Sequence, residues 1–338
     1  MGEAQPKRRA TIMEVAQMAG VSHQTVSRYF RANAGMKQAT RERIRDAVAD
    51  LNYRPNLAAR AMRGGRTGRL GVLLPSGTSI SSLEVLHGAT SAAHAAGYVA
   101  DVIILDGVPD VRRDRAVELV HSGLFDGLVS FTPLDLGDAA DGGSPITVLP
   151  VYDHELRSIG GLADGSTIAD IITALAAMGH RTFMHLGGDY RHTSARSRRD
   201  TYEDTIKAMG LESYGVVDCE WSAEAARGAV AQLPEDSGVT AIIGADDVLA
   251  AGAIRGALDR GWRVPDDVSV TGWDNNRVAA AMAPSLTTVA VDHERLGSRG
   301  MSELLVLMRS GALPEPEGTL TTVVWRESTA PPRRLDQG

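Results

Sequence analysis

Three polar side chains near the N-terminus, His23, Gln24 and Arg28, carry donors and acceptors that match the edges of DNA base pairs. Ser22 is a suitable N-cap for a helix that contains all three, and Val26 supplies its inward position. The polar side chains then fall on the outward face, mostly in the first two turns. A helix with Gln and Arg near its N-terminal end is suited to enter a major groove. The segment therefore predicts contact with duplex DNA.

A second short helix precedes this one and sets its orientation. Val15, Ala16 and Ala19 form one apolar stripe at helical spacing, and Gly20 is a residue that adopts a positive φ at little cost. The small side chains let the two helices cross closely. Residues 12–31 predict a helix-turn-helix, with an ordinary solvated helical hairpin as the alternative.

Charge is distributed unevenly along the 338 residues. Residues 1–66 contain thirteen Lys and Arg against five Asp and Glu, a net charge of +8, although the whole chain carries −7. The remaining 272 residues therefore carry −15. A basic N-terminal part on an acidic body predicts that one end of the protein binds a polyanion through salt-dependent phosphate contacts.

The rest of the basic part is also predicted to be helical. Thr40 is expected to cap a third helix over 41–51, with Ile44 facing inward, which completes a small headpiece. Asn56 is expected to cap a further helix over 57–63. That helix has only about two turns, so it should form when a partner orders it.

From Leu70 onward, short apolar runs alternate with amphipathic helical stretches. This alternation is typical of parallel sheets with helices on both faces, and its length predicts two α/β lobes rather than one open sheet. Ligands of such sheets bind beyond the carboxyl ends of the strands, which here means the cleft between the lobes. The predicted strands are 70–75, 99–105, 126–131, 146–151, 181–186, 241–245 and 268–273, and the predicted helices are 82–96, 112–122, 166–178, 223–233 and 248–261.

Several classes of function are disfavoured. The single cysteine, Cys219, excludes an intramolecular disulfide, and the N-terminal residues lack the apolar run of a secretory signal, so a cytoplasmic protein is expected. No nucleophile elbow, P-loop or zinc-protease motif occurs, and Gly187-Gly188-Asp189 is a weak hint of a phosphate loop. We predict no enzymatic activity, no cofactor and no metal site, with a carbohydrate-processing α/β enzyme as a distant alternative.

Several stretches together resemble one protein family. They are TIMEVAQMAGVSHQTVSR and LNYRPNLAARAM, followed by FDGLV, GHR, SARSRRDTYEDTI, DDVLAAGAIRGALDRGWRVPDDVSVTGWDN and PSLTTVAVD. From about Thr11 to Trp325 the chain is similar to the lactose/galactose repressor family of bacterial transcription regulators. The resemblance implies an all-α helix-turn-helix headpiece with a hinge helix, and a core of two α/β lobes like that of a periplasmic sugar-binding protein.

The resemblance also implies domain limits. These are a basic arm over 1–10, the DNA-binding headpiece over 11–53, a hinge helix and linker over 54–67, an effector-binding and dimerisation core over 68–330, and a tail over 331–338. Lobe 1 of the core would comprise about 68–163 and 293–322, and lobe 2 about 164–292 and a final strand near 323–330. The tail has no leucine heptads, so a homodimer is expected rather than a tetramer.

Contacts with DNA follow from matching positions. His23, Gln24 and Arg28 would read bases, and Met62 stands where two hinge helices pry open a central base step. Arg31 stands where the family usually has Asn and adds a phosphate contact. The full set of predicted DNA-binding residues is Thr11, Ser22, His23, Gln24, Thr25, Ser27, Arg28, Arg31, Asn56, Ala59 and Met62.

Four effector-binding residues follow in the same way: Arg198, Trp221, Asp246 and Asp274. An aromatic face, a forked donor and carboxylates suit a polyhydroxylated ring. Plainer interpretations stay open, namely a solvated charge for Arg198, lobe core for Trp221 and a loop cap for Asp274. Asp246 stands where the family often has Asn, so it offers only acceptors when ionised.

The family implies a repressor of carbohydrate-utilisation genes. It would occupy a palindromic operator as a homodimer and leave it when a small sugar or glycoside binds between the lobes. A regulator that answers to a nucleobase or a phosphorylated sugar is the alternative, and Trp221 with Asp246 and Asp274 argues against a phosphate.

Overall fold

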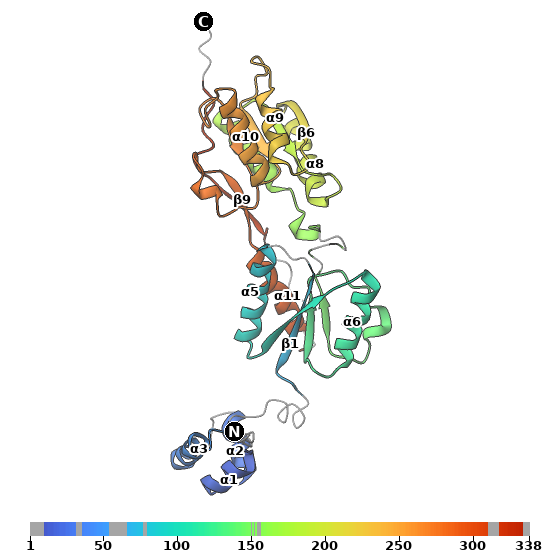
Figure 1. The fold of residues 1–338 in the computed structure, drawn as a ribbon, viewed down its shortest axis with the longest axis vertical. Helices are drawn as coiled ribbons and strands as arrows, with labels where there is room; N and C mark the ends of the chain where they lie inside the picture. Colours follow the sequence, from blue (N-terminus) through green and yellow to red (C-terminus); the bar gives the residue numbers. More distant parts are fainter. Residues whose placement is uncertain are drawn as a thin grey trace, which may run out of the picture. The chain divides into compact units, whose positions relative to one another are not determined.

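The computed structural model describes residues 10–31, 36–53, 66–76, 80–149, 151, 153, 157–309 and 318–333. The chain divides into two compact units, Met1–Thr67 and Gly68–Gly338 (Figure 1). Four predicted features lie wholly or partly outside the described residues: the basic arm except Ala10, the hinge helix with Asn56, Ala59 and Met62, the side chain of Arg31, and the tail after residue 333.

The described part of the first unit consists of α1 (Ile12–Ala19), α2 (His23–Arg31) and α3 (Gln38–Asp50). These helices close around a small apolar core in which Val15, Val26 and Ile44 are fully buried. Gly20 ends α1 with a φ of 63°, the left-handed conformation expected of this glycine. The prediction of a helix-turn-helix is confirmed.

The predicted start of α3 is wrong. The carbonyl of Lys37 accepts the first helical hydrogen bonds, from the amides of Thr40 and Arg41 at 3.0 and 3.1 Å, so Lys37 is the N-cap and its side chain makes no capping bond. Thr40 lies inside the first turn instead of capping it. This turn is supported by Gln38, whose side chain donates to Glu42 Oε1 at 3.0 Å.

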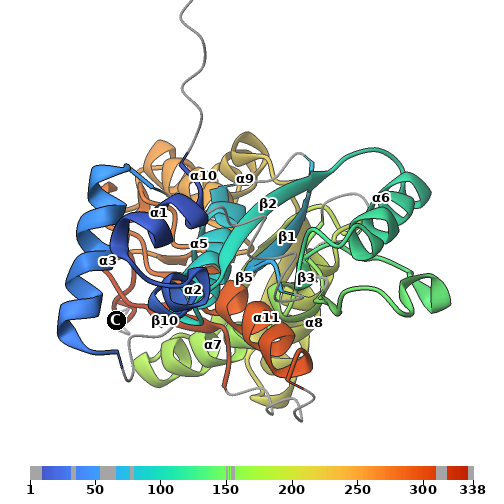
Figure 2. The ribbon, with the colours of Figure 1, turned by 90° about the horizontal axis from the view of Figure 1, so that it is seen from below.

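The first sheet of the second unit contains parallel strands in the order β2-β1-β3-β4, of which Figure 2 labels β2, β1 and β3. Its strands are β1 (Arg69–Pro75), β2 (Val99–Leu105), β3 (Gly127–Ser130) and β4 (Ile146–Val148). Alternate residues of β1 face opposite sides, so Val72 packs with α5 (Ile80–Ala95) and α11 (His293–Leu307), whereas Leu73 packs with α6 (Pro109–His121). Figure 1 shows these helices on the two sides of β1.

The second sheet has the order β6-β5-β7-β8 and is also parallel. Ile171 and Tyr202 are buried between one face and its covering helices, and Leu249 is buried at the other face. The strands are β5 (Thr182–Gly187), β6 (Glu212–Asp218), β7 (Ala241–Gly244) and β8 (Ser269–Thr271); α7 (Thr167–Met178) and α8 (Thr193–Ala208) cover one face, and α9 (Ala223–Ala231) and α10 (Asp247–Asp259) the other. The prediction of a core with two α/β lobes is confirmed. Short 3₁₀ turns occur at Gly137–Ala140, Gly160–Leu162 and Ala279–Ala281.

Three strands differ from the sequence prediction, because β6 and β9 (Thr288–Val291) are not among the predicted strands and β10 (Thr321–Val324) has other bounds. No strand is predicted at β6, because this edge strand is largely exposed and its sequence contains no continuous apolar run. The final strand, β10, is antiparallel to β9 and ends earlier than predicted. Beyond β10, Ser328 is held by isolated backbone hydrogen bonds, donating to Ser285 and accepting from Val270 at 2.9 Å.

Among the described residues, one helical stretch, Gly160–Met178, is long and apolar enough to cross a membrane by length and composition. Half of it is buried inside the protein, and Ile168, Ile171 and Ile172 are fully buried in the core of the second sheet. Packing in the core explains its apolar character.

The crossing of α5 and α11 depends on glycine. A Cβ atom on Gly297 would lie 1.8 Å from the carbonyl oxygen of Val85, and one on Gly88 would lie 1.9 Å from that of Glu294. Gly297→Ala should therefore push the helices apart and lower the free energy of unfolding by about 2–3 kcal/mol, measured by urea denaturation.

Gly228→Ala is the matched control, because Gly228 lies inside α9 and its nearest neighbour would be 4.0 Å from an added Cβ. This variant should be unchanged or more stable by about 0.5–1 kcal/mol. Equal stability of the two variants would contradict the proposed close crossing.

Candidate functional site

The outward face of α2 presents the side chains predicted to read bases. His23, Gln24 and Arg28 are exposed, whereas Val26 between them is fully buried. The amide of Thr25 donates to Ser22 Oγ at 3.2 Å, so Ser22 is the N-cap expected from the sequence. The buried position fixes the rotation of α2 and turns the three polar side chains to solvent.

Hydroxyl groups predicted to contact phosphates also serve as caps. Ser22 Oγ and Thr25 Oγ1 lie 2.9 Å apart, and Thr11 forms a capping box with Glu14 at the start of α1. Glu14 N donates to Thr11 Oγ1 at 3.3 Å, and Thr11 N donates to Glu14 Oε2 at 2.6 Å. For the first two helices, the sequence analysis predicts only the cap at Ser22. The S/T-x-x-E spacing of Thr11 and Glu14 is a usable signal for the cap at the start of α1. Thr11 and Ser22 are exposed, and Thr25 and Ser27 are half-buried.

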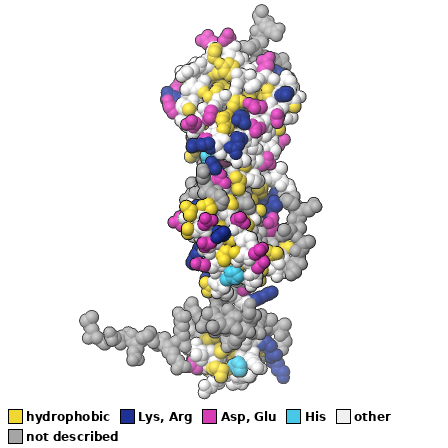
Figure 3. Space-filling view, turned by 90° about the vertical axis from the view of Figure 1, so that its right-hand side faces the viewer, with side chains coloured by type: hydrophobic (Ala, Val, Ile, Leu, Met, Phe, Trp, Pro, Cys, Tyr) yellow, Lys and Arg dark blue, Asp and Glu magenta, His cyan; other side chains and the backbone are white. Residues whose placement is uncertain are grey.

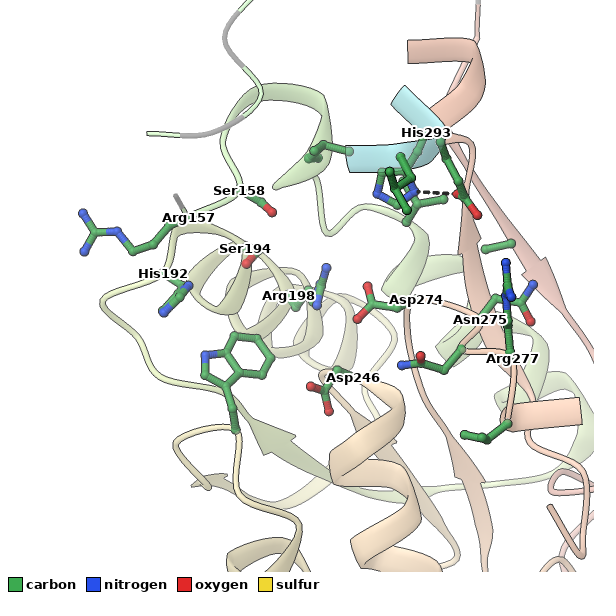
Figure 4. A pocket seen from close by; sticks show the side chains of 18 residues that line it. Arg157, Ser158, His192, Ser194, Arg198, Asp246, Asp274, Asn275, Arg277 and His293 are labelled. Carbon is green, nitrogen blue, oxygen red and sulfur yellow. Dashed lines mark ion pairs between the residues drawn. The ribbon is translucent and has the colours of Figure 1, made fainter. Parts of the chain in front are cut away.

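The second unit contains a cavity of about 1000 Å³. All four predicted effector residues, Arg198, Trp221, Asp246 and Asp274, line it. Figure 4 shows Arg198, Asp246 and Asp274 converging on the same space. The structure thus brings together residues that are up to 76 positions apart in the chain, from Arg198 to Asp274.

The topology of the second sheet explains this convergence. Trp221 follows β6, Asp246 follows β7 and Asp274 follows β8, so all three lie beyond the carboxyl ends of parallel strands. The chain runs from β5 outward to β6 and then returns to β7 on the other side of β5, and this switch point opens a crevice. Arg198 reaches the crevice from α8.

Arg198 is a buried cation whose donors are not all used. Its side chain is 5% exposed; Nη1 donates to the carbonyl of Ala245 at 2.6 Å, and the guanidinium lies 4.2 Å from the ring centre of Trp273. Its Nε is buried and has no hydrogen-bond partner. Burial lowers the pKa of Arg198, and the carboxylates of Asp274 and Asp246 oppose that shift. A solvated charge is therefore the wrong interpretation of this residue.

Asp246 and Asp274 are held in place by different contacts. Asp246 caps α10 by accepting from the amide of Leu249 at 2.7 Å. Burial raises the pKa of Asp246 to about 6; the Leu249 hydrogen bond and Arg198 oppose this shift, and Asp274 adds to it. Asp274 has a φ of 96°, and its amide donates to Val289 at 2.9 Å. A non-glycine residue held in this conformation is backbone strain of the kind found at ligand sites.

Trp221 combines a position at the edge of the core of the second sheet with a place in the cavity wall. A Cβ on Gly188 would lie 2.4 Å from the indole, so only glycine allows the ring this position. The ring of His192 meets the indole edge-on at 5.6 Å, and Trp221 Nε1 is buried without a partner.

The sequence prediction missed other residues of the cavity wall. Asn275, Asn276 and Arg277 directly follow Asp274, so a run of polar residues after a strand was an available signal. His192 and Ser194 come from the start of α8. Further lining residues come from segments associated with the first sheet and carry no local sequence signal; they are Leu83, Glu84, Arg157, Ser158, Leu162 and His293, and His293 pairs with Glu84 at 3.5 Å (Figure 4).

Features that hinted at catalysis have structural roles. The absence of a side chain on Gly188 leaves space for Trp221. The carboxylate of Asp189 forms an ion pair with Arg191 at 2.6 Å, so the Gly187-Gly188-Asp189 turn binds an arginine of the same chain. Cys219 is buried, which raises the pKa of its thiol to about 11. In the part of the chain that the structure describes, no group of three His, Cys, Asp or Glu side chains is arranged to hold a metal ion.

Known protein families match the sequence of each of the two units. Residues 11–56 match the family model of bacterial regulatory proteins of the lacI family, and residues 172–329 match that of a periplasmic binding protein-like domain. The chain is 30% identical over 313 residues to the HTH-type transcriptional regulator GntR of Escherichia coli (strain K12), covering 90% of this chain and 93% of that protein. It is 28% identical to the lactose operon repressor of the same organism, covering 95% and 91%.

A solved structure of the Lac repressor dimer bound to operator and the anti-inducer ONPF has a TM-score of 0.72 and 26% identity, covering 96% of this chain and 100% of that one. These relatives are transcription regulators and not enzymes, as predicted for this chain. The chain therefore belongs to the LacI family of DNA-binding bacterial transcription regulators.

Proposed function

We propose that this regulator is a cytoplasmic repressor of carbohydrate-utilisation genes, released from a palindromic operator by a small sugar or glycoside. One observation carries the proposal. The same chain presents Gln24 and Arg28 on an exposed helix and holds Arg198, with unused donors, beside the carboxylates of Asp246 and Asp274 in a cavity.

Operator recognition is assigned to the headpiece and hinge. His23, Gln24 and Arg28 contact base edges in the major groove, and the hydroxyls of Thr11, Ser22, Thr25 and Ser27 contact phosphates. Arg31 adds a phosphate contact, and Asn56, Ala59 and Met62 belong to the hinge helix that enters the minor groove. The exposure of the three base-reading residues supports this assignment.

The chemistry of the cavity suits a neutral polyhydroxylated ring. The guanidinium of Arg198 offers parallel donors to two adjacent hydroxyls, and Asp246 and Asp274 accept from hydroxyls. The indole of Trp221 covers an apolar C–H face. Two carboxylates in the wall oppose a phosphate group, which favours an unphosphorylated sugar.

A homodimer is the expected assembly, as in the solved Lac repressor dimer. Apolar side chains reach the surface of this chain among charged ones (Figure 3). On the edge strand β2, Val102 and Ile104 are 44% and 51% exposed, and they stand in register with the buried Val72 and Leu74. A second copy that covers this edge removes the apolar surface from water and places two headpieces on one palindrome.

Repression is then relieved by differential binding. The sugar binds better to the arrangement of the core that separates the two headpieces and disorders the hinge helices. Coupling of this kind is typically about 1–3 kcal/mol, or roughly 5–150-fold in operator affinity. Selection of bound duplexes from random DNA, repeated with sugars and nucleobases, tests the whole proposal. Recovery of a palindrome that only a sugar displaces supports it, and displacement by a nucleobase alone supports the alternative effector.

Gln24→Ala should weaken binding to the selected operator by about 1–3 kcal/mol, because one bidentate base contact is lost. Fluorescence anisotropy of a labelled duplex measures the change. Gln17→Ala is the matched control, since Gln17 is exposed on α1 and is not among the predicted contacts. Equal weakening by both substitutions would contradict base reading by α2.

Arg198→Ala should leave operator affinity unchanged and abolish the response to sugar, because the buried donors of the cavity are removed. Met62→Asp should have the opposite effect, weakening the operator complex while tryptophan fluorescence still reports sugar binding. Loss of both properties in either variant would contradict separate sites.

Sugar affinity should depend on pH through Asp246. Burial raises the pKa of Asp246 to about 6, and a donating hydroxyl favours the ionised carboxylate, so affinity should rise about tenfold between pH 5 and 7. Asp246→Asn should show a flatter profile in isothermal titration. Asp247, whose pKa is also raised to about 6, is present in both proteins. The difference between the pH profiles of wild type and Asp246→Asn therefore gives the contribution of the Asp246 carboxylate to sugar affinity.

The same shift has a defined sign for stability. Because the folded-state pKa of Asp246 is raised, its contribution to stability is present below about pH 4 and lost as pH rises through about 6. Asn retains the cap, so Asp246→Asn should raise the melting temperature at pH 7 and leave it unchanged near pH 4. A lower melting temperature at pH 7 would show that the carboxylate stabilises the fold.

A further inference from the structure

The cavity wall contains a strained loop that a neighbouring carboxylate supports. Asp274, Asn275, Asn276 and Arg277 line the cavity consecutively, and φ is 96° at Asp274 and 48° at Asn275. Such conformations persist where surrounding contacts hold them. The contacts that hold this loop therefore determine where the Asp274 carboxylate lies.

Backbone hydrogen bonds hold the two ends of the loop. The first part is held through two amides: that of Gly272 donates to Thr287, and that of Asp274 donates to Val289, each at 2.9 Å. At the other end, the carbonyl of Asn276 accepts from the amide of Ala279 at 2.8 Å.

Side chains bind the residues between these ends. The side-chain oxygen of Asn275 accepts from Arg326 Nη2 at 2.7 Å. The amides of Asn275 and Asn276 are also bound by side chains. Asn275 N donates to Thr288 Oγ1 at 3.2 Å, and Asn276 N donates to Asp247 Oδ2 at 2.6 Å.

Asp247 supports both of these amides. Its Oδ1 accepts from the hydroxyl of Thr288, which itself accepts from Asn275, and its Oδ2 accepts directly from Asn276. Its own amide donates to the carbonyl of Trp273 at 2.9 Å. Asp247 is 4% exposed and Thr288 is fully buried, so water does not replace these bonds.

Asp247 does not line the cavity. It is not the cap of its own helix either, since Asp246 accepts from Leu249 at the start of α10. Space for the carboxylate comes from Gly272, where a Cβ would lie 2.4 Å from Asp247 Oδ1. Two donors converge on its two oxygens, and a carboxylate is the side chain that accepts at both.

We propose that Asp247 is a positioning residue of the effector site: acting directly and through Thr288, it holds the strained loop that presents Asp274 to the effector. The link to an effector rests on the proposed function. The support of the loop is a property of the ligand-free protein and can be measured without any effector.

Hydrogen exchange of the full-length, ligand-free protein tests the proposal, read at the amides of Asn275 and Asn276. Thr288→Val removes the acceptor of the Asn275 amide, and Asp247→Ala removes that of the Asn276 amide. Each variant should therefore accelerate exchange about tenfold at the amide whose acceptor it removes, because local opening becomes easier. Thr288→Ser retains the hydroxyl and should preserve wild-type protection. Thr288→Val, which is nearly isosteric, decides the outcome if Asp247→Ala does not fold.

Ser269→Ala is the matched control. Ser269 is fully buried on β8, and its hydroxyl interacts with His180 and Ala330 rather than with the loop. Its exchange at Asn275 and Asn276 should equal that of the wild type. Unchanged protection in folded Thr288→Val, or equal acceleration in Ser269→Ala, would overturn the proposal. Neither result depends on whether a sugar binds, so a failure here is distinct from a failure of the proposed function.

Discussion

Burial of the Arg198 guanidinium beyond the carboxyl edge of the second sheet is the constraint on which the effector cavity depends. A buried cation is costly unless it is paired or hydrogen-bonded. Here one carbonyl and the face of Trp273 satisfy it in part, and its Nε has no partner. Arg198 lines the cavity, and in the proposed function its remaining donors serve the ligand. The carboxylates of Asp246 and Asp274 lower the cost of the charge and supply acceptors to the same space.

In the headpiece the corresponding constraint is the rotation of the short helix α2 about its own axis. Val26 is buried in a core of few apolar side chains, and this fixes which residues of α2 face solvent. In the proposed function, specificity for DNA therefore depends on a small set of packing contacts, whereas specificity for the effector depends on buried polar groups. The two kinds of site belong to separate compact units, which is why substitutions in one can leave the other intact.

Much of the fold follows from patterns that are local in sequence. Apolar runs in the sequence predict most strands of both sheets. They do not predict β6, because an edge strand does not need an apolar run. Thr40 has the side chain of a typical N-cap, but the N-cap of α3 is Lys37. The four predicted cavity residues came from matching motif positions. The residues from segments of the first sheet, such as Glu84 and His293, reach the cavity only through tertiary structure. Asp247 is adjacent to Asp246, yet its side chain supports a loop rather than the cavity, and no sequence pattern separates the two roles.

In the proposed function, one small molecule in the cavity and one duplex at the headpiece exert opposing effects through the same chain. Thermodynamic linkage makes this coupling reciprocal. The most direct measurement is the affinity of the identified sugar, by isothermal titration, with and without saturating operator duplex. Operator should weaken sugar binding by the same factor by which sugar weakens operator binding. An identical sugar affinity in both conditions would contradict this coupling.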